Sequence, residues 1–65
     1  MQGRKFWVGD RVFVREPGVL RGPLIVASFD PNGRTYTLND ETGTSSWENG
    51  RKVKEEDLQQ DKEKK

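Results

Sequence analysis

The residues of this chain that are best suited to recognition chemistry are its aromatic rings and the acids near them. Phe13 lies between two valines that we expect to face a core, so its ring should point outward. Rings gathered on a surface beside carboxylates attract a cation such as methylated lysine, or form a groove for an extended peptide. The alternative is that they fill the core of a small domain. The candidate peptide-binding residues are Phe13, Phe29, Tyr36 and Trp47 for apolar contact, and Glu16, Asp40 and Glu48 for selecting a basic peptide.

Catalysis and metal binding find little support in the sequence. The 65 residues include no His and no Cys, which removes imidazole and thiolate chemistry. Adjacent acids occur at 40–41 and 55–57, but general acid–base work needs carboxyl groups whose pKa values are separated by burial. The oxygen-rich segments 30–33 and 39–41 lack the spaced carboxylates of a calcium loop and are typical of turns. We therefore expect a noncatalytic chain with no cofactor and no metal.

The basic residues suggest an alternative function, which is nucleic-acid binding through phosphate contacts. Between residues 6 and 58 the chain carries seven Lys or Arg and nine Asp or Glu, a net charge of about −2. This balance favours a solvated surface of mixed charge over a broad phosphate-binding face. The candidate phosphate contacts are Arg4, Lys5, Arg11, Arg15, Arg21 and Arg34.

Short strands must position these side chains. Val12 and Val14 alternate with charged or outward residues, and Tyr36 and Leu38 alternate with threonines, which is the period of a half-buried strand. Turn signals separate these runs, above all the Asn-Gly pairs at 32–33 and 49–50. A short helical turn over 54–58 should return Leu58 to the core. The expected strands are residues 11–15, 24–29, 34–38, 44–47 and 51–53.

The pattern predicts an all-β fold, a five-stranded small barrel with a short C-terminal helical turn. Residues 15–23 are expected to form a long loop between the first two strands. Residues 1–5 should be a flexible arm, 6–58 the barrel, and 59–65 a disordered charged tail. The expected core is Val8, Val12, Val14, Leu24, Val26, Tyr36, Leu38, Val53 and Leu58, with Trp47 partly inside.

One series of motifs resembles a known group of folds. It runs Gly9-Asp10-x-Val12-x-Val14, Gly22-Pro23-Leu24-x-Val26, Tyr36-x-Leu38, Asn49-Gly50, then Val53 with Leu58. The order and gaps are similar to the SH3-like barrels of the retroelement integrase C-terminal and Tudor/chromo-like group, over residues 8–58. The resemblance implies a noncatalytic module, usually within a larger protein, that binds DNA, a peptide tail or a partner protein. Integrase C-terminal domains are generally basic, whereas this core is slightly acidic.

These observations lead to one preferred partner class and one alternative. A protein or peptide bound by an aromatic-lined surface is the first expectation, nucleic acid is the alternative, and the isolated domain should be a monomer. No apolar run reaches the roughly 18 residues that a membrane span requires. The compartment is unknown from the sequence, with an intracellular location, the nucleus included, as the default.

Overall fold

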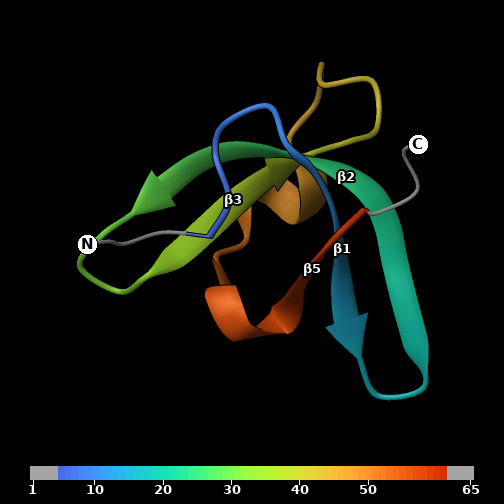
Figure 1. The fold of residues 1–65 in the computed structure, drawn as a ribbon. Coiled ribbons are helices and arrows are strands. Elements are labelled where there is room, and N and C mark those ends of the chain that lie inside the picture. The colour runs from blue at the N-terminus through green and yellow to red at the C-terminus, as the bar shows by residue number, and fades with distance from the viewer. Residues whose placement is uncertain (1–4, 62–65) are drawn as a thin grey trace.

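Buried and exposed residues alternate along the central strands, which form one antiparallel sheet of five strands in the order β4-β3-β2-β1-β5. A computed structural model describes residues 5–61 (Figure 1). The predicted all-β class is confirmed, and the other regular elements are two short 3-10 helices. The elements are β1 (Arg11–Glu16), β2 (Val19–Asp30), β3 (Thr35–Asn39), η1 (Trp47–Gly50), β4 (Val53–Lys54), η2 (Glu55–Asp57) and β5 (Leu58–Gln60).

Strand β2 is the longest element and links the two halves of the sheet. Its first half pairs with β1 and its second half with β3, and the register shifts once in each ladder. Such irregularities bend a strand and increase its twist, and Figure 1 shows β2 curving over the molecule. The sheet curls but does not close, because β4 and β5 are its two edges and no ladder joins them within residues 5–61. The expected closed barrel is wrong in this respect.

The first hairpin differs from the predicted long loop over 15–23. Pro17 and Gly18 make a two-residue turn, so pairing resumes at once between Glu16 and Val19. Pro23 is accommodated inside β2 because it lies where the β1–β2 register shifts, and proline is tolerated in sheets at such irregularities. Residues 19–23 therefore belong to a strand.

The predicted strand over 44–47 is also wrong. Only one isolated bridge, from Asn39 to Ser46, forms there, and η1 follows. The Asp40 carboxylate draws the preceding loop together by accepting from the Thr42 amide, the Thr42 hydroxyl and the Thr44 amide at 2.8–3.2 Å. An acidic side chain that satisfies nearby amides competes with strand pairing.

The fifth strand lies beyond the predicted barrel. The helical turn expected over 54–58 is found as η2, but Gln59 and Gln60, which the sequence assigns to the charged tail, pair with β1. At the other end, the Lys5 amide donates to Glu55 Oε2 at 3.0 Å, although the sequence assigns Lys5 to the flexible arm. Residues 1–4 and 62–65 lie outside the described residues.

The core agrees with the sequence except at one position. Val8 is expected inside, but it is 62% exposed, and Phe6 takes that place at 4%. Phe29 and Trp47 pack against the core while remaining partly exposed. The buried set is Phe6, Val12, Val14, Leu24, Val26, Tyr36, Leu38, Val53 and Leu58.

Candidate functional site

The four rings predicted to form an aromatic surface are brought together only in part, as Phe29 and Tyr36. Tyr36 is fully buried, as its place in the expected core predicts, so its ring is not available on an exposed surface. Phe29 is half-buried against it, with ring centroids 4.8 Å apart. Trp47 packs on the core from η1. Phe13 points to the other face of the sheet, because its neighbours Val12 and Val14 face the core. These rings therefore do not form a cage.

The acids expected to select a basic peptide are engaged within the chain. Glu16 and Glu48 both bind Arg51, at 3.2 and 3.5 Å, and both bind Arg21, at 3.7 and 3.5 Å. Asp40 holds its own loop, and the Thr42 hydroxyl bond is the main cause of the lowered pKa of its carboxyl. These carboxylates are compensated from within the chain.

The four-residue ion network Glu16–Arg21–Glu48–Arg51 attaches the first hairpin to η1. Arg51 also lies over the Trp47 ring, 5.4 Å from the ring centroid, in cation–π geometry. The backbone of η1 is unusual, since its residues Glu48 and Asn49 have φ of 50° and 57°. Such left-handed residues persist only when their surroundings hold them. The network therefore fixes η1 rather than presenting an open cation site.

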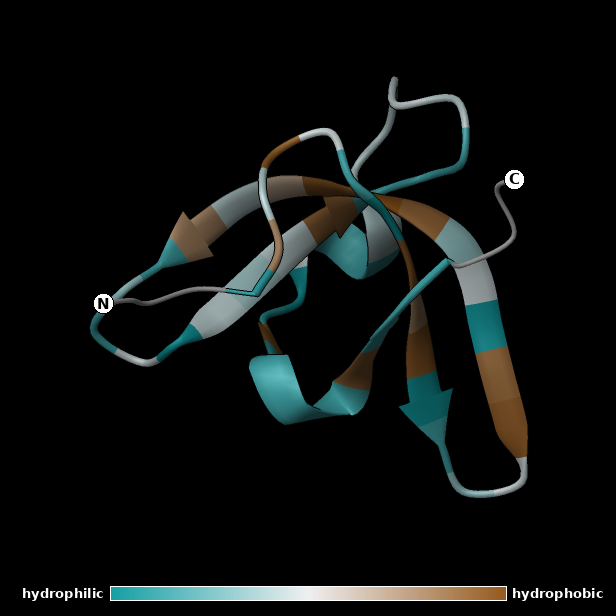
Figure 2. Cartoon of the chain, in the orientation of Figure 1, coloured by the Kyte–Doolittle hydropathy of each residue, from teal (hydrophilic) through white to brown (hydrophobic). Residues whose placement is uncertain are grey.

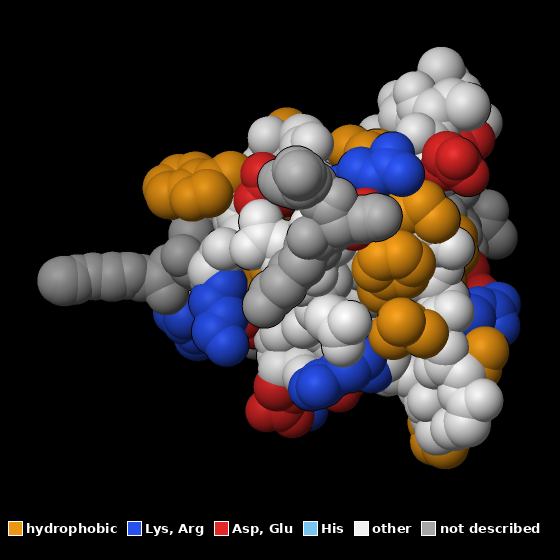
Figure 3. Space-filling model, turned by 45° about the vertical axis from the view of Figure 1, so that its right-hand side comes forward, with side chains coloured by type: hydrophobic (Ala, Val, Ile, Leu, Met, Phe, Trp, Pro, Cys, Tyr) orange, Lys and Arg blue, Asp and Glu red, His pale blue; other side chains and the backbone are white. Residues whose placement is uncertain are grey.

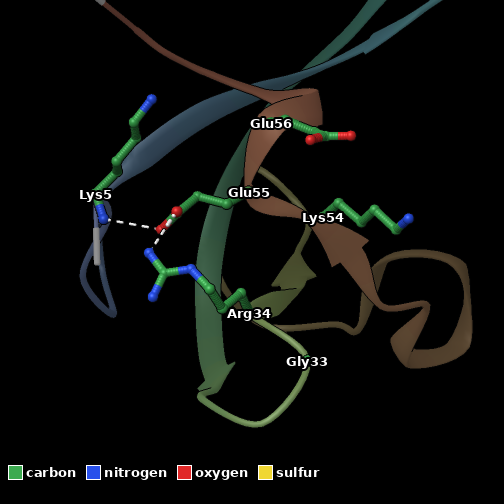
Figure 4. Close-up of a pocket in the computed structure, with 6 residues that line it drawn as sticks. All are labelled: Lys5, Gly33, Arg34, Lys54, Glu55 and Glu56. Atoms are coloured by element: carbon green, nitrogen blue, oxygen red, sulfur yellow. Dashed lines mark hydrogen bonds and ion pairs between the residues drawn. The ribbon is translucent and has the colours of Figure 1, made fainter. Parts of the chain in front are cut away.

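A second cluster surrounds Glu55 at the end of β4 (Figure 4). The Tyr36 hydroxyl donates to Glu55 Oε2 at 2.6 Å, and the Lys5 amide donates to the same oxygen at 3.0 Å. Arg34 Nη2 donates to Oε1 at 2.8 Å. Arg34 itself has a left-handed φ of 52°. Two segments that are distant from Glu55 in sequence, one at Lys5 and one at 34–36, thus converge on its carboxylate.

These contacts shift the pKa values of both partners. The Tyr36 hydroxyl bond, together with the Lys5 amide and Arg34, lowers the pKa of Glu55 to about 2 against the desolvation that would raise it. Burial, and then the bond to Glu55, raise the pKa of Tyr36. At neutral pH Glu55 stays ionised and Tyr36 stays protonated, so the pair is poorly suited to proton transfer. The cluster instead links the chain at Lys5, Arg34 and Tyr36 to Glu55 and so stabilises the fold.

Replacing Tyr36 by Phe is expected to lower the free energy of unfolding by about 1–2 kcal/mol, because a buried hydroxyl that donates to a carboxylate is lost. Denaturant unfolding at pH 7 measures this. Ser28→Ala is the matched control, since it removes an exposed hydroxyl contact to Thr37 at 2.7 Å and should change stability by less than about 0.5 kcal/mol. Equal effects of the two changes would contradict a special stabilising role of the Tyr36–Glu55 hydrogen bond.

The charged side chains that line the hollow next to this cluster do not converge on one point where a ligand could bind. The hollow has a volume of about 340 Å³ and is lined by residues that include Lys5, Lys54 and Glu56. Figure 4 shows the Lys5 and Lys54 side chains on opposite sides of Glu55, with neither ammonium group directed at the other. The cations therefore do not gather around a common point.

The described arginines expected to contact phosphates bind oxygen atoms of the chain itself, which are carboxylates for three of them and a backbone carbonyl for Arg15. Figure 3 shows blue and red side chains interleaved, and no broad basic zone, on the face that it presents. Arg4 lies outside the described residues, and Lys5 lies at the Glu55 cluster. The contacts are Arg11 with Asp61 at 2.9 Å, Arg15 with the Glu56 carbonyl at 2.8 Å, Arg21 with Glu16 and Glu48, and Arg34 with Glu55.

The turn before β1, Trp7–Asp10, is not among the site residues predicted from the sequence. The side chains of Trp7 and Val8 are 60% and 62% exposed. The Trp7 amide donates to Asp10 Oδ2 at 2.9 Å, and the Asp10 amide donates back to the Trp7 carbonyl at 2.9 Å. Bonds between Gly9, Asp10 and Val26 at 2.9 and 3.0 Å fasten the turn to β2. A hydrogen-bonded turn thus holds two large apolar residues in solvent.

The sequence carries a signal for this turn. Phe6, Trp7 and Val8 are consecutive and directly precede Gly9-Asp10, and three successive apolar residues cannot all face one core. A second exposed apolar pair, Val19 and Leu20, lies at the start of β2. Figure 2 shows hydrophobic residues in the loop before β1 and at the start of β2, well separated from each other. The Trp7–Asp10 turn and this hairpin tip are distinct surfaces.

Comparisons of the chain with protein-family models, curated proteins and solved structures give no match. Within residues 5–61, no three acidic side chains are arranged to hold a metal ion. The same residues contain no helix with the length and apolar character needed to cross a membrane.

Proposed function

We propose that this chain is a noncatalytic SH3-like module that binds another protein or peptide through the Trp7–Asp10 turn. The observation that carries the proposal is the exposure of Trp7 and Val8 on a backbone held by hydrogen bonds. The strand arrangement supports the SH3-like part. A long bent β2 joins the two halves of a five-stranded antiparallel sheet, the last strand returns to pair with β1, and η2 separates the last two strands.

The energetics of recognition favour such a turn. Tryptophan is enriched among the few interface residues that supply most of the binding free energy. Because the turn is already ordered by contacts with Asp10 and Val26, little conformational entropy is lost when a partner covers Trp7. The neighbouring Val8 adds apolar area to the same spot. A partner with an apolar side chain fits this surface.

The ion pairs of the arginines make nucleic-acid binding a less favoured function than peptide binding. A phosphate-binding face uses cations that are available to phosphate groups. Arg11 and Arg34, by contrast, bind Asp61 and Glu55 at 2.9 and 2.8 Å. Binding to DNA would have to break these ion pairs.

Heteronuclear NMR titration tests the proposal with three probe peptides: a basic histone-tail type, a proline-rich peptide and an acidic peptide with alternating valines. We expect one of them to shift the amide signals of Val8, Gly9 and Asp10. Trp7→Ala should weaken that complex about 30-fold, the loss typical of a central interface tryptophan. The fold should persist, because the Trp7 side chain is largely exposed.

Leu20→Ala is the matched control, since it truncates an exposed apolar residue at the hairpin tip. It should leave the affinity within about twofold, as for a residue outside the contact. If no peptide shifts the turn at millimolar concentration, the proposal fails. Salt-dependent binding of a DNA duplex without any peptide binding would favour the alternative.

A further inference from the structure

The outer edge of β5 is the feature that suggests how a partner binds. β5 is the last strand of the sheet and pairs with β1 on one side only. The register opposes Val12 to Gln60, Phe13 to Gln59 and Val14 to Leu58. A strand at a sheet edge presents backbone groups that can pair with another chain.

The hydrogen-bond alternation identifies the groups that face outward. The Asp61 amide donates to the Arg11 carbonyl at 3.1 Å, so that directly opposed pair is hydrogen-bonded. In an antiparallel ladder such pairs alternate with pairs whose amides and carbonyls point away from each other. Gln59 therefore bonds to β1, whereas the amide and carbonyl of Gln60 and the carbonyl of Leu58 point to the open edge. The Leu58 amide is used by the Glu55 carbonyl.

A hollow of about 350 Å³ lies along this edge. It is lined by Lys5 and Phe6 on one side and by Leu58, Gln59 and Gln60 on the other. Phe6 and Leu58 are 4% and 6% exposed and form an apolar floor, while Lys5 and the two glutamines are exposed. The volume is at the lower end of the range for ligand sites, which suits one or two side chains of an extended chain.

We propose that an extended segment of the partner protein adds as a strand to the free edge of β5. Its backbone bonds to Gln60, an apolar side chain enters the hollow over Phe6 and Leu58, and an acidic neighbour lies near Lys5. This inference rests on the proposed function, because Phe6 directly precedes Trp7 and the same segment would contact both. Backbone bonds supply affinity in strand addition, and alternate side chains supply specificity.

The occupant is a peptide segment rather than a second copy of this chain. A stable dimer buries about 800 Å² on each partner, roughly a fifth of the 4289 Å² exposed by this molecule. β5 has three residues, so edge-to-edge pairing of two copies covers much less. A flexible segment needs only a few residues on this edge and can extend to the Trp7–Asp10 turn.

The test uses the acidic, valine-containing peptide, acetyl-Glu-Val-Thr-Val-Glu-amide, on the whole chain. Bound peptide should slow hydrogen exchange of the Gln60 amide at least fivefold and shift the Gln59–Asp61 signals. Gln60→Pro, which removes an outward amide and no ladder bond, should weaken binding about tenfold and leave the fold intact. A chain made by chemical synthesis with an ester in place of the residue-60 amide tests the same bond if the proline variant does not fold.

The outcomes separate this inference from the proposed function. If Trp7→Ala weakens binding while the Gln60 variants and Gln60 exchange are unchanged, strand addition is wrong and the Trp7–Asp10 turn remains the site. If a peptide of the panel binds and Gln60 variants weaken it but Trp7→Ala does not, the edge is retained without the turn. Sedimentation that shows dimers lost in Gln60→Pro would replace the peptide with a second copy.

Discussion

Lowering the pH from 7 to 3 is expected to remove about 2 kcal/mol of stability through Glu55 alone. The pKa of this carboxyl is about 2 in the folded chain, against an ordinary value of 4.5. A depressed folded pKa adds stability above the unfolded pKa, and that stability is lost as the pH falls toward the folded value. Since a domain of this size is stabilised by only about 3–10 kcal/mol, the loss is a large fraction of the total.

The cause of this loss is the arrangement of donors around one carboxylate. The Tyr36 hydroxyl, the Lys5 amide and Arg34 all donate to Glu55, and each interaction favours the ionised form. Protonation of Glu55 would remove the charge that attracts the Arg34 guanidinium at 2.8 Å. Denaturant titrations at several pH values between 7 and 3 measure the resulting slope of stability with pH.

Glu55→Gln isolates this contribution. The amide cannot ionise, so the variant should be less stable than the parent chain at pH 7. The difference should shrink as the pH falls to 3 and disappear only below the folded pKa of about 2. Glu56→Gln is the matched control, because it removes the same charge from the adjacent, exposed residue, whose side chain makes no hydrogen bond within residues 5–61. An unchanged pH slope in Glu55→Gln would show that other carboxyl groups cause the acid sensitivity.

The sequence predicts the central strands well and the segments between them poorly. The alternation around Val12 and Val14, and around Tyr36 and Leu38, identifies buried residues because a period of two is a local property. Asn32-Gly33 likewise marks a turn between neighbouring strands. These features need no knowledge of distant contacts.

The features that sequence reasoning misses depend on residues far apart in the chain. Glu55 reads as one acid in a charged run, and only folding brings Lys5, Arg34 and Tyr36 around it. Gln59 and Gln60 read as tail, yet β1 supplies the partner that makes them a strand. Polar composition alone cannot reveal an edge strand whose stability comes from its neighbour.

The candidate site escapes sequence reasoning for a related reason. The strand pattern predicts that Tyr36 is buried, but residue type does not reveal that Trp7 stays exposed while its neighbour Phe6 enters the core. Which ring is exposed depends on where Phe6 enters the core, and this depends on the Tyr36 ring, 5.6 Å from that of Phe6. The recognition surface that we propose is therefore a consequence of packing at the N-terminal segment.

Gly22→Ala is expected to destabilise the chain by about 2–3 kcal/mol. Gly22 has a φ of 136°, a region that side chains rarely adopt. A Cβ there would lie 3.1 Å from Phe13 Cδ2, 3.1 Å from the Val12 carbonyl oxygen and 3.2 Å from the Leu24 amide nitrogen. Two of these atoms belong to the backbone of the β1–β2 ladder and cannot move without disturbing its pairing.

Gly18→Ala separates the cost of a side chain at positive φ from the cost of steric crowding around its Cβ. Gly18 also has a positive φ, 77°, but no atom lies within 4 Å of the position that a Cβ would occupy, so the cost should be about 1 kcal/mol. The shift of the denaturant midpoint at an unchanged m-value measures the loss of stability in each variant. If the two cost the same, the close approach at Gly22 contributes nothing. If Gly22→Ala costs more, the extra cost measures how closely β1 and β2 approach each other beside Phe13. Since β5 pairs with β1 at Phe13, the edge proposed to receive a peptide depends on that approach.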